Sequence, residues 1–208
     1  MRSFSSLTSR MAPLSGNNID TDQIIPASYL KVTDKKGLGK GLFANWRFDE
    51  TGEPRPEFVL NQKDYRDARI LLAGDNFGSG SSREHAAWAL QDHGFKVVIS
   101  TRFADIFQAN AAKNGLLTAT VERGDHVKLM QLAQDAPTAE VTVDLHQLLI
   151  EVPGVGSMSF EVDPFVRHCL LNGVDQLGFL LGRQDAVEAY EAQHPQFVWT
   201  LATSNLKE

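Results

Sequence analysis

Short apolar runs alternate with helix-forming stretches through the middle of the chain. The runs at 69–77, 96–103 and 116–121 are nearly continuous, which is typical of strands buried on both faces of a parallel sheet. Residues 82–94 and 104–115 are rich in helix formers, and each stretch closes with a glycine suited to a helix C-cap. The order strand–helix–strand–helix–strand predicts a parallel α/β unit with right-handed crossovers.

The pattern changes on the carboxyl side of this unit. Residues 140–162 alternate apolar and polar positions around "PGVG", which predicts an antiparallel hairpin with one wet face. The stretches 163–173 and 185–194 are predicted to be closing helices. The α/β core therefore carries an added hairpin and helices.

The amino-terminal part has weaker periodicity. We interpret the Ser/Arg-rich first 14 residues as a frayed lead-in to a first strand, and "NIDTDQIIPASYL" as a turn, a short apolar strand and a break at Pro26. From about 31 to 60 the composition shifts to glycine, proline and charge without a steady period, which predicts a mobile insertion. Its "LFANWRF" segment has too many aromatic residues for a plain linker, so part of it should dock.

Bulk properties narrow the class of protein. A chain of 208 residues is long enough for one sizeable domain, here expected to span 1–208 with the insertion as its lobe. The net charge of −6 argues against a nucleic-acid binder, and no apolar run is long enough to span a bilayer. The single cysteine, Cys169, cannot by itself hold zinc or an iron–sulfur cluster, and we expect a buried thiol in a cytoplasmic protein.

The stretch "GDNFGSGSSREHAAWAL" (74–90) joins a predicted strand to a predicted helix. Such a turn presents free backbone N–H groups and the positive end of a helix dipole, which together suit an anion. The stretch lacks the Lys-Ser/Thr of a nucleotide P-loop, and neither GxGxxG nor the GxSxG nucleophile elbow is present. An anion site and a purely structural turn with a serine N-cap both remain open.

The side chains of this stretch add chemistry to the anion hypothesis. Arg83 offers a fixed fork of donors that matches a carboxylate. A serine hydroxyl among N–H donors has a stabilised alkoxide and can act as a base. Glu84 and His85 are interpreted as helix-start or supporting groups.

These residues carry a family resemblance. "GDNFGSGSSREHAAWAL" resembles the signature of the swivelling domain of the aconitase superfamily, most nearly its isopropylmalate isomerase small subunits. "NIDTDQIIPASYL", "GLFANWRF", "GFKVVISTRFADIF" and the carboxyl-terminal "RHCLLNG" are also similar, so the resemblance covers nearly the whole chain.

The resemblance implies a swivelling β/β/α fold and a partner. In that family a separate large subunit holds a [4Fe–4S] cluster through three cysteines, and the open iron acts as a Lewis acid on the substrate. No cofactor or metal is expected on this chain, which would be inactive alone.

Site residues follow by motif. Ser81 corresponds to the family's general base and Arg83 to the arginine that clamps a substrate carboxylate. Ser82, Gly80 and the backbone N–H groups of the loop would support the site. Asp20 and Asp22 lie in a matching motif near the cleft, where turn and cap formation is as reasonable a role as a direct one.

Substrate choice in the family is set after the Tyr-Leu pair. Tricarboxylate users place an arginine there, whereas isopropylmalate users tend to have uncharged residues. This chain has Lys31, a departure from that pattern, between Leu30 and Val32, whose apolar side chains suit an isopropyl group. Ser79 stands where bacterial relatives often have cysteine.

The resemblance thus implies the small subunit of a hydro-lyase that interconverts 2- and 3-isopropylmalate in leucine biosynthesis, acting on a small dicarboxylate. A paralogous hydratase subunit acting on citraconate, dimethylmaleate or homoaconitate is the alternative within the same chemistry. A non-catalytic anion-binding module is the alternative from another class.

Overall fold

The computed structural model describes residues 3–30 and 35–194. The chain divides into two compact units, Met1–Asp175 and Gln176–Glu208, which are described separately. The interpretation as one domain over 1–208 stays a prediction, because the placement of the units relative to each other is not described. Across 3–30 and 35–194, no helix is long and apolar enough to cross a membrane.

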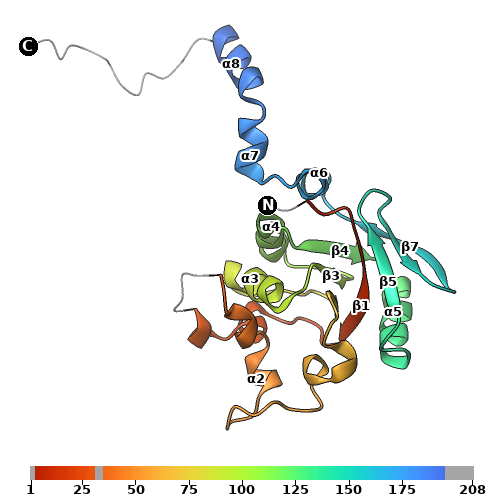
Figure 1. Ribbon diagram of the computed structural model, residues 1–208. Helices are drawn as coiled ribbons and strands as arrows, with labels where there is room; N and C mark the ends of the chain where they lie inside the picture. Colours follow the sequence, from red (N-terminus) through yellow and green to blue (C-terminus); the bar gives the residue numbers. More distant parts are fainter. Residues whose placement is uncertain (1–2, 31–34, 195–208) are drawn as a thin grey trace, which may run out of the picture. The chain divides into compact units, whose positions relative to one another are not determined.

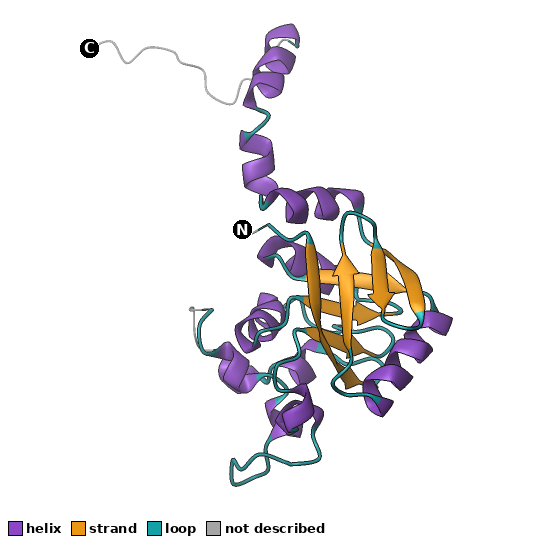
Figure 2. Cartoon of the chain, turned by 45° about the vertical axis from the view of Figure 1, so that its right-hand side comes forward, coloured by secondary structure: helices purple, strands orange, loops and turns teal. Residues whose placement is uncertain are grey.

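The strands of the first unit form a closed barrel in the order β1-β2-β3-β4-β7-β6-β5 (Figure 2). Four neighbouring strands run parallel: β1 (Ser6–Leu14), β2 (Ile70–Ala73), β3 (Val97–Ser100) and β4 (Leu117–Val121). Three antiparallel strands close the barrel: β5 (Glu140–Asp144), β6 (Leu149–Val152) and β7 (Gly156–Glu161). The α/β unit predicted for the middle of the chain is confirmed.

The prediction of one hairpin over 140–162 was wrong in its first half. A turn divides the segment after Asp144, where the Asp144 carboxylate accepts the Gln147 N–H at 2.8 Å and Leu148 has a φ of 57°. The alternation of apolar and polar positions continues through this turn, so the pattern alone does not reveal it.

The first strand also lies elsewhere than predicted. The supposed lead-in is β1 itself, whose residues 6–10 pair antiparallel with β5 while residues 11–14 pair parallel with β2. This one strand therefore joins the parallel and antiparallel parts of the barrel. Its exposed positions carry Ser, Thr and Arg, which hide the apolar alternation in the sequence.

The apolar run after Asp20 is helical, so the predicted short strand was wrong. Helix α1 (Thr21–Ile24) begins with a capping box, in which the Asp20 carboxylate accepts the Gln23 N–H at 2.8 Å and Gln23 Oε1 accepts the Asp20 N–H at 2.9 Å. The two reciprocal bonds satisfy the N–H groups of Asp20 and Gln23, which in a strand would need a neighbouring strand. This local capping favours a helix more strongly than the short apolar run favours a strand.

Helices cover the barrel on separate sides. Helices α3 (Glu84–His93) and α4 (Asp105–Asn114) lie on one side, and α5 (Arg123–Asp135), which was not predicted, packs on β1 (Figure 1). Helix α6 (Pro164–Asn172) begins at Asp163, which caps it, and confirms the first closing helix. Both faces of the parallel strands are buried, since Leu71 belongs to the core under α3 and α4 while Ile70 faces the core shared with β5–β7.

The aromatic part of the insertion docks, as predicted. The elements here are η1 (Ala27–Tyr29), η2 (Leu38–Gly41), α2 (Ala44–Arg47), η3 (Val59–Asn61) and η4 (Lys63–Tyr65). Leu42 and Phe43 are fully buried in the core beneath α3. Gly39 lies so close to α3 that an added Cβ would be 2.6 Å from the His93 nitrogen. Residues 31–34 of the insertion lie outside the described residues.

The second unit contains α7 (Gln176–Leu181), which was not predicted, and α8 (Gln184–Gln193), which confirms the second closing helix. Neither helix has a buried residue.

Candidate functional site

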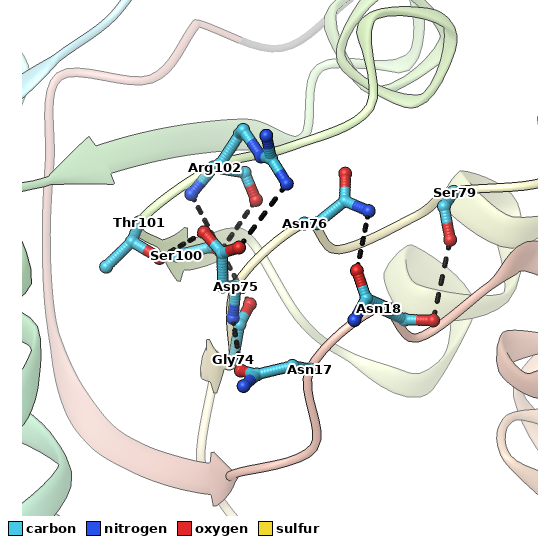
Figure 3. Close-up of polar contacts among 9 residues, drawn as sticks. All are labelled: Asn17, Asn18, Gly74, Asp75, Asn76, Ser79, Ser100, Thr101 and Arg102. Carbon is cyan, nitrogen blue, oxygen red and sulfur yellow. Dashed lines mark hydrogen bonds and ion pairs between the residues drawn. The ribbon is translucent and has the colours of Figure 1, made fainter.

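The Gly/Ser loop (residues 74–83) leaves the carboxyl end of β2 and enters α3. It lies between two other turns at the same end of the parallel strands, one after β1 and one after β3 (Figure 3). Ligand sites of α/β proteins gather at this end of the strands. The loop is therefore where the fold brings separate chain segments together.

Glycine is required at two positions of the loop by close packing. An added Cβ at Gly74 would lie 2.6 Å from Asn17 Oδ1, and one at Gly78 would lie 2.6 Å from Phe107 Cβ. Gly78 also has a φ of 79°, which disfavours any larger residue. These contacts press the first half of the loop against the β1 turn and α4.

A polar frame holds the same half in place. The Asp75 carboxylate accepts the Thr101 hydroxyl at 2.8 Å and lies 3.4 Å from an Arg102 guanidinium nitrogen, while the Asp75 N–H donates to Asn17 Oδ1 at 2.8 Å (Figure 3). Ser100 donates its hydroxyl to the Gly74 carbonyl at 2.7 Å. The loop is thereby tied to the turns that follow β1 and β3.

The second half of the loop is held differently. Two of its carbonyls accept hydrogen bonds from Thr21 of α1: the Ser79 carbonyl from the Thr21 N–H at 2.9 Å, and the Ser81 carbonyl from the Thr21 hydroxyl at 3.1 Å. Within the described residues, the Ser81 and Ser82 hydroxyls make no hydrogen bond, and both serines are exposed. The Ser81 carbonyl is held, while the hydroxyls of both serines remain available to a ligand.

The alternative left open for this stretch, a structural turn with a serine N-cap on α3, is not what the structure has. Arg83 is the N-cap residue, and no side chain caps the helix. The first-turn N–H groups of α3 thus adjoin the two exposed serines without a capping oxygen, an arrangement that favours an anion.

Arg83 pairs with an acid from another motif. Its guanidinium nitrogen donates to Asp22 Oδ1, and the exposed fractions of the two side chains are 25% and 53%. The fold thus brings Asp22 to the loop. One guanidinium edge is held by a carboxylate, and Arg83 has further donors for a second one.

The remaining predicted residues separate into groups. Asp20 caps α1 and packs near Gly80, where an added Cβ would lie 3.3 Å from Asp20 Cβ. Glu84 is the first residue of α3, and the His85 ring lies 4.7 Å from the Trp88 ring. Leu30 is half-buried against the core. Lys31 and Val32 lie outside the described residues.

Metal ligands do not gather in the described part of the chain. There, no group of three or more His, Cys, Asp or Glu side chains is arranged to hold a metal ion. Cys169 is buried on α6, and burial raises the pKa of its thiol. A thiol kept neutral in the core is a poor metal ligand, so the residues present do not fit an iron–sulfur cluster.

The polar residues that hold the first half of the loop in place were not identified from the sequence. Asn18, Asn76, Thr101 and Arg102 were not singled out, although all four follow strands of the parallel sheet or adjoin its turns. Their positions after parallel strands could have indicated them, because the carboxyl ends of parallel strands meet at one edge of the sheet.

Comparisons with known proteins agree with this geometry. The model of the aconitase C-terminal domain family matches residues 1–124. A 3-isopropylmalate dehydratase small subunit from Roseiflexus castenholzii is 54% identical over 98% of this chain and 100% of its own length. One from Anaeromyxobacter dehalogenans is 53% identical over 89% of this chain and 95% of its own.

A solved structure is similar as well. The crystal structure of a 3-isopropylmalate dehydratase from Methanocaldococcus jannaschii has a TM-score of 0.64 and 26% identity, covering 89% of this chain and 99% of that one. The family resemblance and the α/β fold expected from it are therefore confirmed. On the matched domain and the near full-length identity, the chain belongs to the 3-isopropylmalate dehydratase small-subunit family of the aconitase superfamily.

Proposed function

We propose that this chain acts with a large subunit as a hydro-lyase that interconverts 2- and 3-isopropylmalate by dehydration and rehydration, in leucine biosynthesis. Near full-length identity to several 3-isopropylmalate dehydratase small subunits supports the activity, and a small subunit implies a large one. The single observation that carries the site is the juxtaposition of exposed Ser81 with Arg83, on a half-loop that its frame leaves open.

Ser81 is the proposed base. Its hydroxyl is exposed and makes no hydrogen bond within the described residues, while its carbonyl is held by the Thr21 hydroxyl and the Arg83 N–H. The adjacent uncapped turn of α3 lowers the cost of negative charge on the serine oxygen. In dehydration, Ser81 Oγ takes the proton from the substrate carbon; in rehydration, it returns that proton to the neighbouring carbon.

Arg83 is the proposed carboxylate clamp, and Asp22 orients it. A guanidinium fork binds a carboxylate through two parallel hydrogen bonds, provided that the fork is held in one plane. The Asp22 contact restrains that plane from the side of α1. Ser82 and the backbone around Gly80 complete the donor set that faces the substrate.

The substrate's apolar end is assigned to the segment after η1. Leu30 is half-buried at its start, and Lys31 and Val32 follow in the sequence. We propose that Leu30 and Val32 pack against the isopropyl group. A charged residue at 31 is compatible with that role when its aliphatic stem lies along the apolar surface.

The rest of the site belongs to the partner. We propose that the large subunit carries the [4Fe–4S] cluster, which supplies Lewis acidity toward the substrate hydroxyl and carboxylate when bound. The chain itself then supplies the base and the carboxylate clamp, and the swivelling-domain relationship suggests that the two halves close on the substrate together.

Reconstitution tests this proposal. The chain, purified with its cluster-loaded large subunit, should convert 3-isopropylmalate to isopropylmaleate and 2-isopropylmalate, whereas either subunit alone should not. Turnover of citraconate, dimethylmaleate or homoaconitate in preference would instead assign a paralogous hydratase. Absence of any dehydratase activity in an assembled, cluster-bearing complex would leave only the non-catalytic anion-binding module.

A further inference from the structure

Two asparagines face each other across the site in the same unusual backbone conformation. Asn18, in the turn after β1, has a φ of 55°, and Asn76, in the Gly/Ser loop, has a φ of 56°. The Asn76 side-chain amide donates to Asn18 Oδ1 at 2.8 Å (Figure 3). Each residue belongs to one of the two motifs that carry the site, and neither has a part in the proposed chemistry.

Backbone conformation alone does not explain asparagine at both positions. Glycine adopts positive φ at no steric cost, and the same loop uses it at Gly78 and Gly80. Asparagine tolerates the left-handed region less well than glycine but adds an amide. The amide–amide hydrogen bond is what these side chains contribute beyond the turn itself.

The pair begins a series of contacts that leads to the catalytic groups. The Asn18 N–H donates to the Asp75 carbonyl at 2.8 Å, and the Gly78 N–H then donates to the Ile19 carbonyl at 2.8 Å. Two residues further along, Thr21 holds the carbonyls of Ser79 and Ser81. The register between the two segments therefore continues from the β1–β2 pairing, past the asparagines, to the contacts beside Ser81.

This register also sets the ion pair. Asp22 follows Thr21 on α1, and Arg83 follows Ser81 after one residue. A shift of one segment against the other would change how Asp22 meets Arg83 and where the Ser81 hydroxyl lies. Displacements of about 1 Å at reacting groups reduce rates by up to about a hundredfold.

We propose that Asn18 and Asn76 form a positioning pair for the isomerisation, which sets the α1 segment against the Gly/Ser loop and thereby places Ser81 and Arg83. The proposal rests on the function proposed above. It assigns the pair no contact with substrate, and its effect reaches the reaction through the loop.

A double-mutant cycle tests the pair in the assembled two-subunit enzyme. Asn18→Gly and Asn76→Gly each keep the left-handed backbone and remove the amide bond. Each should lower kcat by roughly tenfold, and the double variant should be no slower than either single variant, because both remove one interaction. Wild-type kcat in both singles, or a double variant whose loss is the product of the two, would overturn the proposal.

Conservative variants separate positioning from simple loss of stability. Asn18 acts as the acceptor, so Asn18→Asp keeps the oxygen and should retain most of the kcat; Asn76→Asp loses the donor and should fall as far as Asn76→Gly. Equal losses in the two aspartate variants would contradict the pair. These variants also decide the question if a glycine variant fails to assemble.

Two controls complete the design. Among residues 3–30 and 35–194, the exposed Asn172 amide bonds only to His168 of α6, so the kcat of Asn172→Gly should match that of the wild type. An inactive wild-type complex would count against the proposed function, whereas an active one with unaffected variants would count against the positioning pair alone.

Discussion

The two halves of the Gly/Ser loop differ in what their polar groups do. In residues 74–78, side chains and close glycine contacts tie the backbone to the turns after β1 and β3. In residues 79–83, the Ser79 and Ser81 carbonyls are held, but Ser81 and Ser82 are exposed and Arg83 has donors to spare. One half is a frame and the other carries the groups proposed to react with or bind the substrate.

The difference has a physical basis. A base or a carboxylate clamp works only when it is not already satisfied by the protein, yet it must be held in place to within a fraction of an ångström. Because the neighbouring residues hold the loop through their own hydrogen bonds, the proposed reactive groups need few hydrogen bonds to the protein. Substitutions in the two halves should therefore fail in different ways. Those in residues 79–83 should remove the proposed chemistry directly, whereas those in residues 74–78 should lower stability or displace the other half.

The largest effect is expected at Ser81. Ser81→Ala removes the proposed base and should reduce kcat of the assembled enzyme by roughly 10²- to 10⁴-fold. Assembly with the large subunit, followed by size-exclusion chromatography, should be unchanged because the side chain is exposed. Ser82→Ala is the matched control with a smaller loss; a wild-type rate in Ser81→Ala would remove the base assignment.

Arg83→Lys should act mainly on substrate binding. A point charge replaces a bidentate fork, so KM for 3-isopropylmalate should rise roughly ten- to a hundredfold, in line with the strength of charge-assisted hydrogen bonds. Steady-state kinetics measure this directly. Arg102→Lys, in the turn after β3 that contacts Asp75, should leave KM near the wild-type value, and a KM unaffected at position 83 would argue against the clamp.

Gly78→Ala should act on stability instead. Its Cβ would overlap the Phe107 side chain at a φ of 79°, and overpacking of this kind lowers the free energy of unfolding by about 1–3 kcal/mol. Urea unfolding of the chain measures the loss. Gly52 has a similar φ of 87° with nothing within 4 Å of an added Cβ, so Gly52→Ala measures the cost of the backbone conformation alone. Equal losses of unfolding free energy in the two variants would exclude the Phe107 contact as the cause.

The smallest effect is expected at Asp22. Exposed ion pairs contribute about 0–1 kcal/mol, so Asp22→Asn should raise KM by no more than about fivefold, as Arg83 loses the charge that orients it. The difference in KM between Asp22→Asn and the wild type should shrink as the salt concentration rises, because salt screens the attraction between Asp22 and Arg83. A fall in KM would mean that Asp22 competes with the substrate for Arg83.

Sequence patterns predicted the fold where burial is continuous and failed where local chemistry competes. The strands at Ile70 and Val97 were found because both faces are buried. The run at Ile24 and Ile25 was assigned to a strand, although the capping box of Asp20 begins a helix that includes Ile24 and ends before Ile25. Strand β1 was missed because its exposed side carries Ser, Thr and Arg.

For the site, motif similarity singled out Ser81, Arg83 and Asp22 but not their relation. The Arg83–Asp22 ion pair joins residues 61 positions apart, and the Asn18–Asn76 bond spans 58. Neither spacing has a period that a sequence pattern can reveal. Pairing between segments depends on the register of β1 against β2, which is a property of the barrel.

Periodicity, cap chemistry and a dense motif were thus sufficient for the α/β unit and the family and for proposing Ser81 and Arg83 as reactive residues, because each depends on neighbours in the chain. Closure of the barrel by β5–β7, the division of the loop into frame and reactive half, and the pairing of Arg83 were decided by tertiary structure. Those features depend on which distant segments the shared core holds together, and that follows from packing rather than from local sequence.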